Sequence, residues 1–474
     1  MAVFYNAGEV KTRPGVYQRH TNIGFDIPAY AQDGICAIPI RSAWGPLGKV
    51  VKNNTIKELE ENFGTGEYSL EHTVPAAVAM FNGGASVVYT YRLGTGGTKA
   101  SKEIATGMTA TAKYVGTMPI SVAVQNKIGD TTRKQMQVYV GTTLVEKFDF
   151  LADGTTEGES LMAVAKNSAY IDLTAETAPA TVPVLAVASG ALEGGVNPTV
   201  ANEDYSKAFA ALEPYYYNTI ALDVDDDENM TLSLLLQAYL AGAYEYGKLA
   251  IIVVGEKASV PFADRCAHAR AFNDAKVVYL GGGWMVGTES KDGVLAICHT
   301  AGVIAATPSN QGITHTVING ATDLCESLTF AQYVEAIEAG MLMVAMSPEG
   351  TIWYDSGINT LVSPETATQD DGWKKIRRAK VRFELINRLD MALAPKVGRV
   401  SQDSDGISDI IQAGQRVLDA MANNEGKLMP GATFVEDPSN PASGDSAWFI
   451  VQADDSDSLE KIYLQYQFRY SQNS

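Results

Sequence analysis

The spacing of apolar residues changes twice along this chain, each time near a glycine-rich junction. Before the first junction, at 93–98, the pattern predicts four elements: strand 34–41, helix 55–63, helix 71–81 and strand 86–91. Residues 1–20 show little helical periodicity, and a Pro14-Gly15 turn signal there precedes an extended stretch. We therefore expect an N-terminal arm at 1–20, followed by an α/β unit at 21–98.

Between this junction and the second one, at 192–195, the composition shifts towards threonine, valine, alanine and glycine. Residues 99–195 contain short runs of strand character, which predict strands at 110–115, 119–125, 134–141, 144–150 and 182–187. A β-rich domain inserted into the α/β unit is the simplest interpretation.

Strand and helix patterns alternate beyond the second junction, across residues 196–346. The predicted order is helix 203–213, strand 219–224, helix 231–246, strand 249–254, helix 262–274, strand 276–280 and helix 291–305. Such alternation is typical of βαβ units, and it predicts a parallel sheet.

The last unit, 347–468, combines two predicted helices with three predicted strands. These elements are helices 371–393 and 407–424 and strands 431–436, 446–453 and 459–470. In the last strand, alternation puts Ile462, Leu464 and Phe468 on one face, which we expect to pack against the sheet of this unit. Residues 469–474 are expected to leave the unit as a C-terminal arm.

Composition indicates a large globular protein and disfavours several functions. The chain has 474 residues, of which 46% are hydrophobic and 19% charged, enough for several cores. A net charge of −19 disfavours direct binding of nucleic acid or of an anionic membrane, and no apolar run is long enough to span a bilayer. The N-terminus lacks a signal-peptide core, so we expect a protein made and kept in a cytoplasm.

Residues that could carry chemistry are scattered. The four cysteines and five histidines form no CxxC or HExxH pattern, and we expect the thiols to be buried. The glycines at 281–283 fail the dinucleotide-binding spacing, and the GxxxxGK spacing at 242–248 lacks the flanking elements of a phosphate loop. The acidic stretches 223–228 and 401–406 are interpreted as helix caps rather than calcium sites. We predict no catalytic residue, cofactor or metal, and keep an α/β ligand-binding enzyme with a β-insertion domain as the alternative.

One short stretch is strongly basic in this acidic chain. Six of its nine residues are cations: Lys374, Lys375, Arg377, Arg378, Lys380 and Arg382. On a helix, Ile376 and Phe383 face inward while the cations cover the other sides. Either a solvated helix face or a patch complementary to an acidic neighbour, copy or partner fits this pattern.

Several motifs, taken in order, resemble those of contractile phage tail sheath proteins. The N-terminal motifs are Arg13-Pro14-Gly15-Val16-Tyr17, Trp44-Gly45-Pro46, Asn62-Phe63-Gly64, Met80-Phe81-Asn82-Gly83-Gly84 and Tyr89-Thr90-Tyr91-Arg92. The C-terminal motifs are the basic helix, Val397-Gly398-Arg399-Val400 and Leu459-Glu460-Lys461-Ile462-Tyr463-Leu464. The chain looks most like sheaths of Gram-positive myophages, defective prophages and R-type bacteriocins.

The resemblance implies an α/β and α+β multidomain fold: a mixed α/β sheath core, an inserted β-rich outer domain at 99–195, and extended terminal arms. It implies a non-enzymatic structural subunit that polymerises as stacked hexameric rings around an inner tube and contracts to drive the tube through a target envelope. The implied partners are further copies of the chain, the inner tail tube protein, and baseplate and tail terminator proteins. The implied location is a virion tail or bacteriocin particle assembled in the bacterial host cytoplasm; another virion tail component is a remaining alternative.

The resemblance also assigns candidate contact residues. The inter-subunit arms would include Pro14, Gly15, Val16, Tyr17, Tyr466, Phe468 and Tyr470. A helix of the C-terminal unit, 371–393 or 407–424, would contact the tube, and the basic cluster favours the first if the tube surface is acidic.

Overall fold

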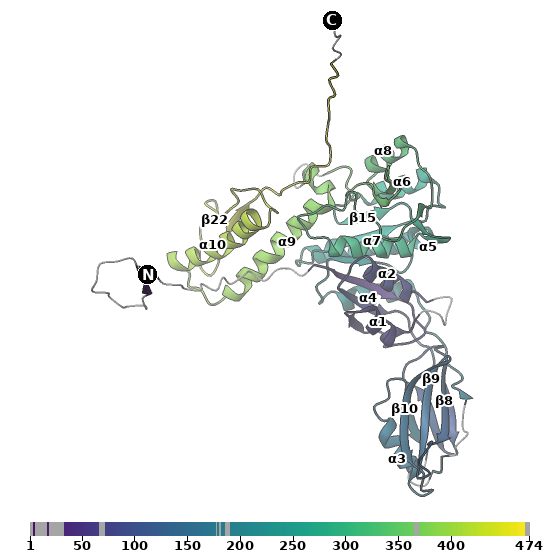
Figure 1. Cartoon of the computed structure of the whole chain (residues 1–474). Helices are drawn as coiled ribbons and strands as arrows, with labels where there is room; N and C mark the ends of the chain where they lie inside the picture. Colours follow the sequence, from purple (N-terminus) through teal and green to yellow (C-terminus); the bar gives the residue numbers. More distant parts are fainter. Residues whose placement is uncertain are drawn as a thin grey trace.

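A computed structural model describes most of the chain. The described residues are 3–4, 17–18, 33–65, 72–176, 178–179, 182–184, 190–364 and 369–469, with 3–4, 17–18 and 227–229 described by backbone alone. Figure 1 shows a central α/β body, a β-rich domain at one end, a helical domain projecting to the side, and an extended C-terminal segment. No helix in these described ranges is long and apolar enough to cross a membrane.

A seven-stranded sheet forms the centre of the molecule. Its strand order is β19 (Met341–Leu342), β15 (Val277–Leu280), β14 (Ile251–Gly255), β13 (Thr219–Ala221), β3 (Ile35–Ile40), β5 (Val87–Arg92) and β4 (Val50–Asn53). All neighbours are parallel except β4, which runs antiparallel to β5. Because β3 pairs with β13, the regions 21–98 and 196–346 build one sheet, whereas the sequence pattern presented them as two units.

Helices cover both faces of this sheet. One face packs against α1 (Ile56–Phe63), α2 (Val74–Asn82) and α7 (Val294–Ala306), and the other against α4 (Asn202–Leu212), α5 (Asp226–Tyr244), α6 (Phe262–Phe272) and α8 (Phe330–Glu338). Helices α2 and α7 approach so closely that a Cβ on Gly302 would lie 2.1 Å from the carbonyl oxygen of Met80. The glycine is therefore required by packing.

Smaller strands border the central sheet. They are β16 (Trp284–Val286), β17 (Glu289–Lys291), β18 (Asp323–Leu324), β20 (Val344–Met346) and β21 (Ile352–Tyr354). At the N-terminus, β1 (Val3–Phe4) pairs in parallel with β2 (Tyr17–Gln18). The glycines at 281–283 pack closely against neighbouring backbone, since a Cβ on Gly283 would lie 2.3 Å from the carbonyl oxygen of Lys291.

The inserted domain has its own core between two sheets. One sheet has the order β10 (Thr143–Leu151), β9 (Arg133–Val140), β8 (Ile120–Asn126) and β12 (Gly190–Ala191); the other has β11 (Ile171–Ala175), β7 (Met108–Ala112) and β6 (Ser101–Ala105). Helix α3 (Glu157–Ala165) packs against β10 and β11. The sequence pattern missed β6, β11 and α3, and the strand predicted at 182–187 is absent from its described residues, 182–184.

Arg92 and Trp44 join the inserted domain to the central body. The buried Arg92 guanidinium donates to the carbonyl oxygens of Ser42 (2.9 Å), Gly45 (2.7 Å) and Val115 (2.9 Å), which lie on both sides of the junction. Trp44 belongs to the core of the inserted domain, where its ring lies edge-on to that of Tyr114 at 5.0 Å. The junction is therefore a fixed, hydrogen-bonded contact.

The C-terminal domain is built on two long helices. It contains the 3₁₀ turn η2 (Asp371–Lys374), α9 (Ile376–Leu393), η3 (Ala394–Lys396), α10 (Ser404–Asp419), the π-helical turn η4 (Ala420–Asn424), β22 (Thr433–Glu436) and β23 (Phe449–Gln452). The predicted strand at 459–470 is wrong for its described residues, which carry no strand. Ile462, Leu464 and Phe468 are 70%, 70% and 92% exposed, so they do not pack against the sheet of this domain. An alternating pattern needs a partner strand, and the residues described here offer none within reach of them.

Candidate functional site

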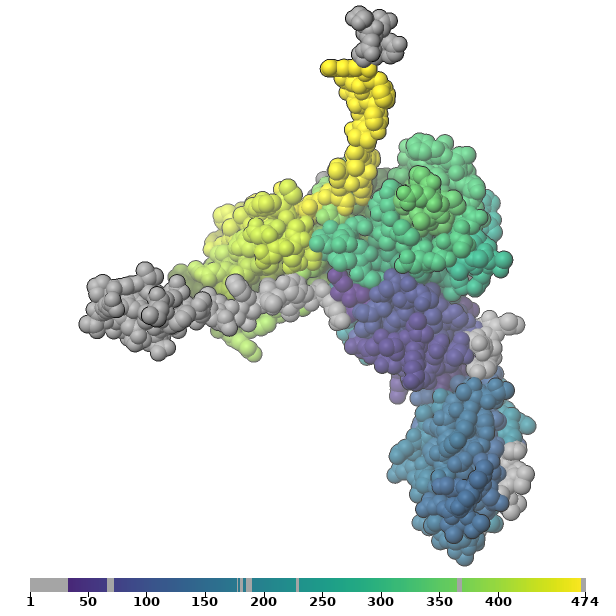
Figure 2. Space-filling model, viewed as in Figure 1, coloured from purple at the N-terminus to yellow at the C-terminus, as the bar shows by residue number. Residues whose placement is uncertain are grey.

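The candidate site is the point where the C-terminal segment leaves the body of the protein. Past its contacts with α9, the C-terminal segment runs outward, as the yellow projection in Figure 2 shows. The exposed segment begins before the C-terminal arm predicted at 469–474, and we therefore call 461–474 the C-terminal arm and 454–460 the arm root. Alternation along the arm puts Ile462, Leu464 and Phe468 on one face, and all three are exposed. A row of exposed apolar side chains on an extended backbone is a template for pairing with another strand.

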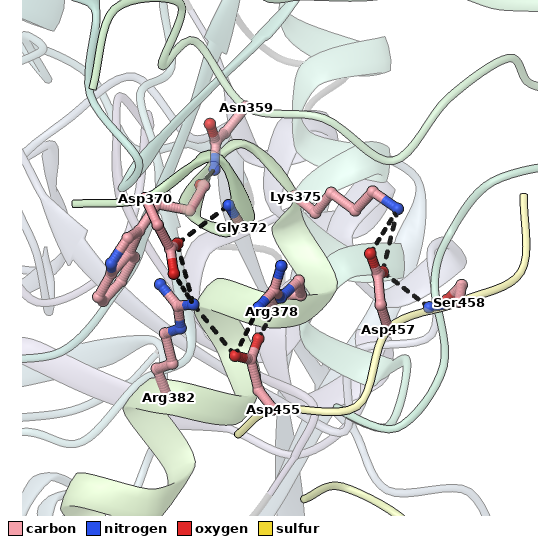
Figure 3. A network of polar contacts seen from close by, with 10 residues as sticks. Asn359, Asp370, Gly372, Lys375, Arg378, Arg382, Asp455, Asp457 and Ser458 are labelled. Atoms are coloured by element: carbon pink, nitrogen blue, oxygen red, sulfur yellow. Dashed lines mark hydrogen bonds and ion pairs between the residues drawn. The ribbon is translucent and has the colours of Figure 1, made fainter. Parts of the chain in front are cut away.

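Three cations at the start of α9 hold the arm root. Figure 3 shows that Arg378 forms a two-pronged pair with Asp455, with Nη2 2.8 Å from Oδ1, and that Arg382 donates to the same Asp455 Oδ1 at 3.0 Å. The Lys375 ammonium lies 2.9 Å from Asp457 and 3.1 Å from Glu460. We call these six residues the arm clamp.

The surroundings of the arm clamp orient its arginines. The Arg382 guanidinium lies 4.4 Å from the centre of the Trp373 ring, and it also donates to Asp370 at 3.1 Å. The Arg378 guanidinium packs against Gly372, where a Cβ would lie 2.3 Å from Cζ. Planar stacking and two-pronged pairing are properties of arginine that lysine lacks, so these positions require arginine.

The cations around them lower the pKa of two carboxylates of the arm clamp, Asp455 and Asp457. Burial by itself raises the pKa of Asp455, but hydrogen bonds from Arg378 and Arg382 outweigh burial and leave its pKa below the usual range. The pKa of Asp457 is lowered in the same way through Lys375. A depressed carboxyl pKa means that this stabilisation is present above the ordinary carboxyl pKa and is lost as the pH falls through the lower folded value. The ion pairs of Asp455 and Asp457 should therefore weaken in acid.

The remaining cations of the basic stretch have different environments. Lys374 pairs with Asp371 at 3.0 Å. Lys380 is buried, and its ammonium donates to the carbonyl oxygens of Ile304 (2.6 Å) and Thr307 at the end of α7. Burial lowers the pKa of Lys380 to about 8. Arg377 is also buried.

These placements correct the expectation that all six cations cover the outer sides of the helix. Lys380 and Arg377 face the interior, while Lys375, Arg378 and Arg382 already hold carboxylates of their own chain. Contact of the six cations with the tube or a neighbour stays a prediction.

The structure describes only part of the predicted arm residues. Tyr466 and Phe468 are exposed, and their rings stack with centroids 6.2 Å apart. Tyr17 lies in β2 and is described by backbone alone, while Pro14, Gly15, Val16 and Tyr470 lie outside the described residues. Sequence reasoning missed the acidic arm root. The spacing of Asp455, Asp457 and Glu460 just before the apolar arm was the available signal.

Loss of one arginine should loosen the arm root without unfolding the domain. In Arg378→Ala, Asp455 keeps Arg382 as its one arginine partner. Because the lost charged pair contributes about 1 kcal/mol, we expect the rate of amide hydrogen exchange across 453–458 to rise several-fold. Arg399→Ala, at an exposed position of the same domain, is the matched control. Exchange at 453–458 that is equal in both variants would contradict the assigned role of the arm clamp.

A second polar cluster lies at the carboxyl edge of the central sheet. Asp226, Glu256 and Tyr279 are buried there, and each has an oxygen without a hydrogen-bond partner among the described residues. Burial raises the pKa of Asp226 to about 7, against the hydrogen bond from Ser233 and with a further increase from nearby Glu256. The described residues contain no group of three or more metal-ligating side chains placed to hold an ion. Asp226 belongs to the stretch 223–228, which was predicted to cap a helix, and its side chain is buried. The capping role itself stays a prediction.

Asp226 should make stability depend on pH. Its pKa is about 7 in the folded protein and near 4 in the unfolded chain, so stability falls as the pH rises between these values. In Asp226→Asn this dependence disappears, and we expect a melting temperature above that of the wild type at pH 8 but not at pH 5. The exposed Asp390→Asn is the control. Equal differences at both pH values would contradict the assignment.

Comparison with known proteins shows what this chain is similar to. Residues 199–359 match the family model described as phage tail sheath protein central domain. Two proteins of Bacillus subtilis (strain 168) are each 24% identical: the uncharacterized protein YqbK, over 89% of this chain and 90% of its own length, and the phage-like element PBSX protein XkdK, over 82% and 81%.

Solved structures share the fold. The sheath tail protein Lin1278 of Listeria innocua aligns with a TM-score of 0.69 at 18% identity, covering 90% of this chain and 96% of Lin1278. The helical sheath of the anti-feeding prophage in its contracted state aligns with a TM-score of 0.53 at 14% identity, covering 97% of this chain and 99% of the sheath chain.

Proposed function

We propose that this chain is the structural subunit of a contractile tail sheath, because residues 199–359 match the phage tail sheath central-domain model and the fold is shared with a sheath tail protein. The observation that carries the proposal is the exposed arm on a clamped root. The arm presents an apolar face that its own subunit leaves uncovered, while three cations fix the root to α9. This arrangement suits a strand donated to a neighbouring copy.

The position of the arm supports an open assembly. A strand that leaves one copy and pairs with another makes a head-to-tail contact, and repeated head-to-tail contacts generate rings or helical tubes. We propose stacked six-fold rings around an inner tail tube, joined at their ends to baseplate and terminator proteins. The particle would be a virion tail or a bacteriocin assembled in the bacterial cytoplasm.

Contraction requires subunits to move while they stay connected. Main-chain hydrogen bonds between an arm and a neighbour depend on the arm alone, so the rigid bodies on either side can rotate. The arm clamp supports this role, since it separates an anchored root from an arm whose described residues, 461–469, form no strand with their own subunit. We propose that the subunit performs mechanical work without catalysis, as the assembled sheath relaxes to a shorter state.

Negative-stain microscopy of the purified full chain tests this function. We expect hollow tubes or stacked rings at high protein concentration, alone or with the inner tube protein. A protein that stays strictly monomeric under both conditions would contradict the proposal.

A further inference from the structure

Helix α8 exposes a row of apolar side chains. Phe330, Val334 and Ile337 are 84%, 39% and 43% exposed, and their spacing of four and three residues puts them on one side of the helix. On the other side, Ala336 is buried against the central sheet. Apolar anchors at this spacing are typical of a helix that binds in a groove of another protein. We call Phe330, Val334 and Ile337 the α8 ridge.

The start of α8 is fixed within the subunit. The Thr329 side chain accepts a hydrogen bond from the backbone of Gln332, and the Gln332 side chain accepts one from the backbone of Thr329 at 2.9 Å. The helix carries two exposed acids, Glu335 and Glu338, and no cation. The α8 ridge is therefore a preformed apolar surface with an acidic border.

A groove that suits such a ridge lies on the opposite face of the central sheet. It has a volume of about 490 Å³, and its walls come from α2, α7 and the β16–β17 hairpin. The chief wall residues are Pro75, Val78, Trp284, Val286, Leu295 and His299. The groove opens to the surface, where Val286 is 38% exposed, and we call it the α2–α7 groove. Because α8 covers one face of the sheet and α2 and α7 the other, a copy cannot fill its own groove with its own ridge (Figure 1).

The charges of the α2–α7 groove complement those of the α8 ridge. The His299 ring lies edge-on to the Trp284 ring at 5.0 Å, and burial lowers the pKa of His299 to about 4, so the imidazole is neutral at pH 7. Lys291, at the border of the groove, pairs with Glu289 of the same hairpin. A lysine ammonium has three donors, so Lys291 can also bind a carboxylate from the acidic border of a ridge.

We propose that the α8 ridge of one copy binds in the α2–α7 groove of a second copy, with Glu335 of the ridge beside Lys291 of the groove. Two different surfaces meet in this contact, so it is head-to-tail and can repeat along a ring or a tube. The inference rests on the proposed function, to which it adds a contact between the bodies of neighbouring subunits beside the contact made by their arms.

Loss of the ridge should weaken assembly and leave the subunit unchanged. In the full-length double variant Phe330→Ser/Val334→Ser, the concentration at which polymer forms should rise at least about tenfold, because two apolar side chains no longer become buried. Below that concentration its melting temperature should equal that of the wild type. Leu234→Ser/Leu235→Ser on α5, at side chains 42% and 37% exposed, is the matched control and should polymerise like the wild type. A ridge variant that also polymerises like the wild type would overturn the contact.

Disulfide cross-linking tests whether the groove is the partner of the ridge. Full-length Val334→Cys and Val286→Cys are mixed and oxidised, and electrophoresis without reductant should show a dimer that neither variant forms alone. Leu234→Cys mixed with Val286→Cys should give no dimer. Equal yields from both mixtures, or no dimer from the first, would overturn the contact. A wild type that never polymerises would reject the proposed function, while cross-linking between soluble copies still decides the contact.

Discussion

Removal of residues 461–474 is expected to abolish polymer formation and leave the fold of the subunit intact. The described arm residues make no strand, and the apolar side chains of the arm are exposed, so their removal costs the isolated subunit little. The arm clamp stays complete, because it ends at Glu460. Sedimentation velocity should show a monomer at concentrations where the full chain forms large particles, and circular dichroism should be unchanged.

Point variants separate the two faces of the arm. Changing Ile462, Leu464 and Phe468 to serine should weaken assembly strongly, since each buried apolar side chain contributes about 1.5–3 kcal/mol. Changing Gln465 and Gln467 to serine on the other face is the matched control and should preserve assembly. Equal losses from both faces would show that the arm does not pair through its apolar side.

Arg92→Leu is expected to lower the free energy of unfolding by about 3–5 kcal/mol, in the range for breaking a buried charged network. The substitution removes three donors and leaves the carbonyl oxygens of Ser42, Gly45 and Val115 without them. Urea unfolding followed by tryptophan fluorescence measures the change, since Trp44 lies in the core of the inserted domain. The exposed Arg399→Leu serves as the control. A loss below about 1 kcal/mol would mean that Arg92 does not hold the junction.

Local patterns predicted the elements of the central body well. Strands β13, β14 and β15 are buried on both faces, so they read as continuous apolar runs between amphipathic helices, and the parallel sheet is confirmed. The pairing of β3 with β13 could not be read in the same way. Their registered residues Cys36 and Thr219 are 183 positions apart, with the inserted domain between them, and strand alternation does not specify a partner.

The candidate site shows a second limit of sequence reasoning. In the sequence, Arg377, Arg378 and Lys380 are equivalent members of one basic run. Helix geometry directs Arg378 to the arm root and Lys380 to the end of α7, while Arg377 is buried without a pair. Which side each cation faces depends on elements that pack against α9 from distant parts of the chain. For that reason the sequence pattern could not show that Arg377 and Lys380 are buried.

The sequence pattern predicts a strand in the arm, but the described arm residues form none. Period-two alternation in the arm correctly indicates an extended backbone with an apolar face. It says nothing about whether the partner strand belongs to the same copy. The exposed side chains of Ile462 and Leu464 show that the described part of the subunit does not provide this partner.

A cryo-electron microscopy reconstruction of the polymer formed by the full chain tests the central claim most directly. Our account predicts that residues 461–469 are extended and hydrogen-bonded to the backbone of a different copy, while Asp455 remains bound to Arg378 of its own. A polymer in which the arm contacts only its own subunit would contradict this account.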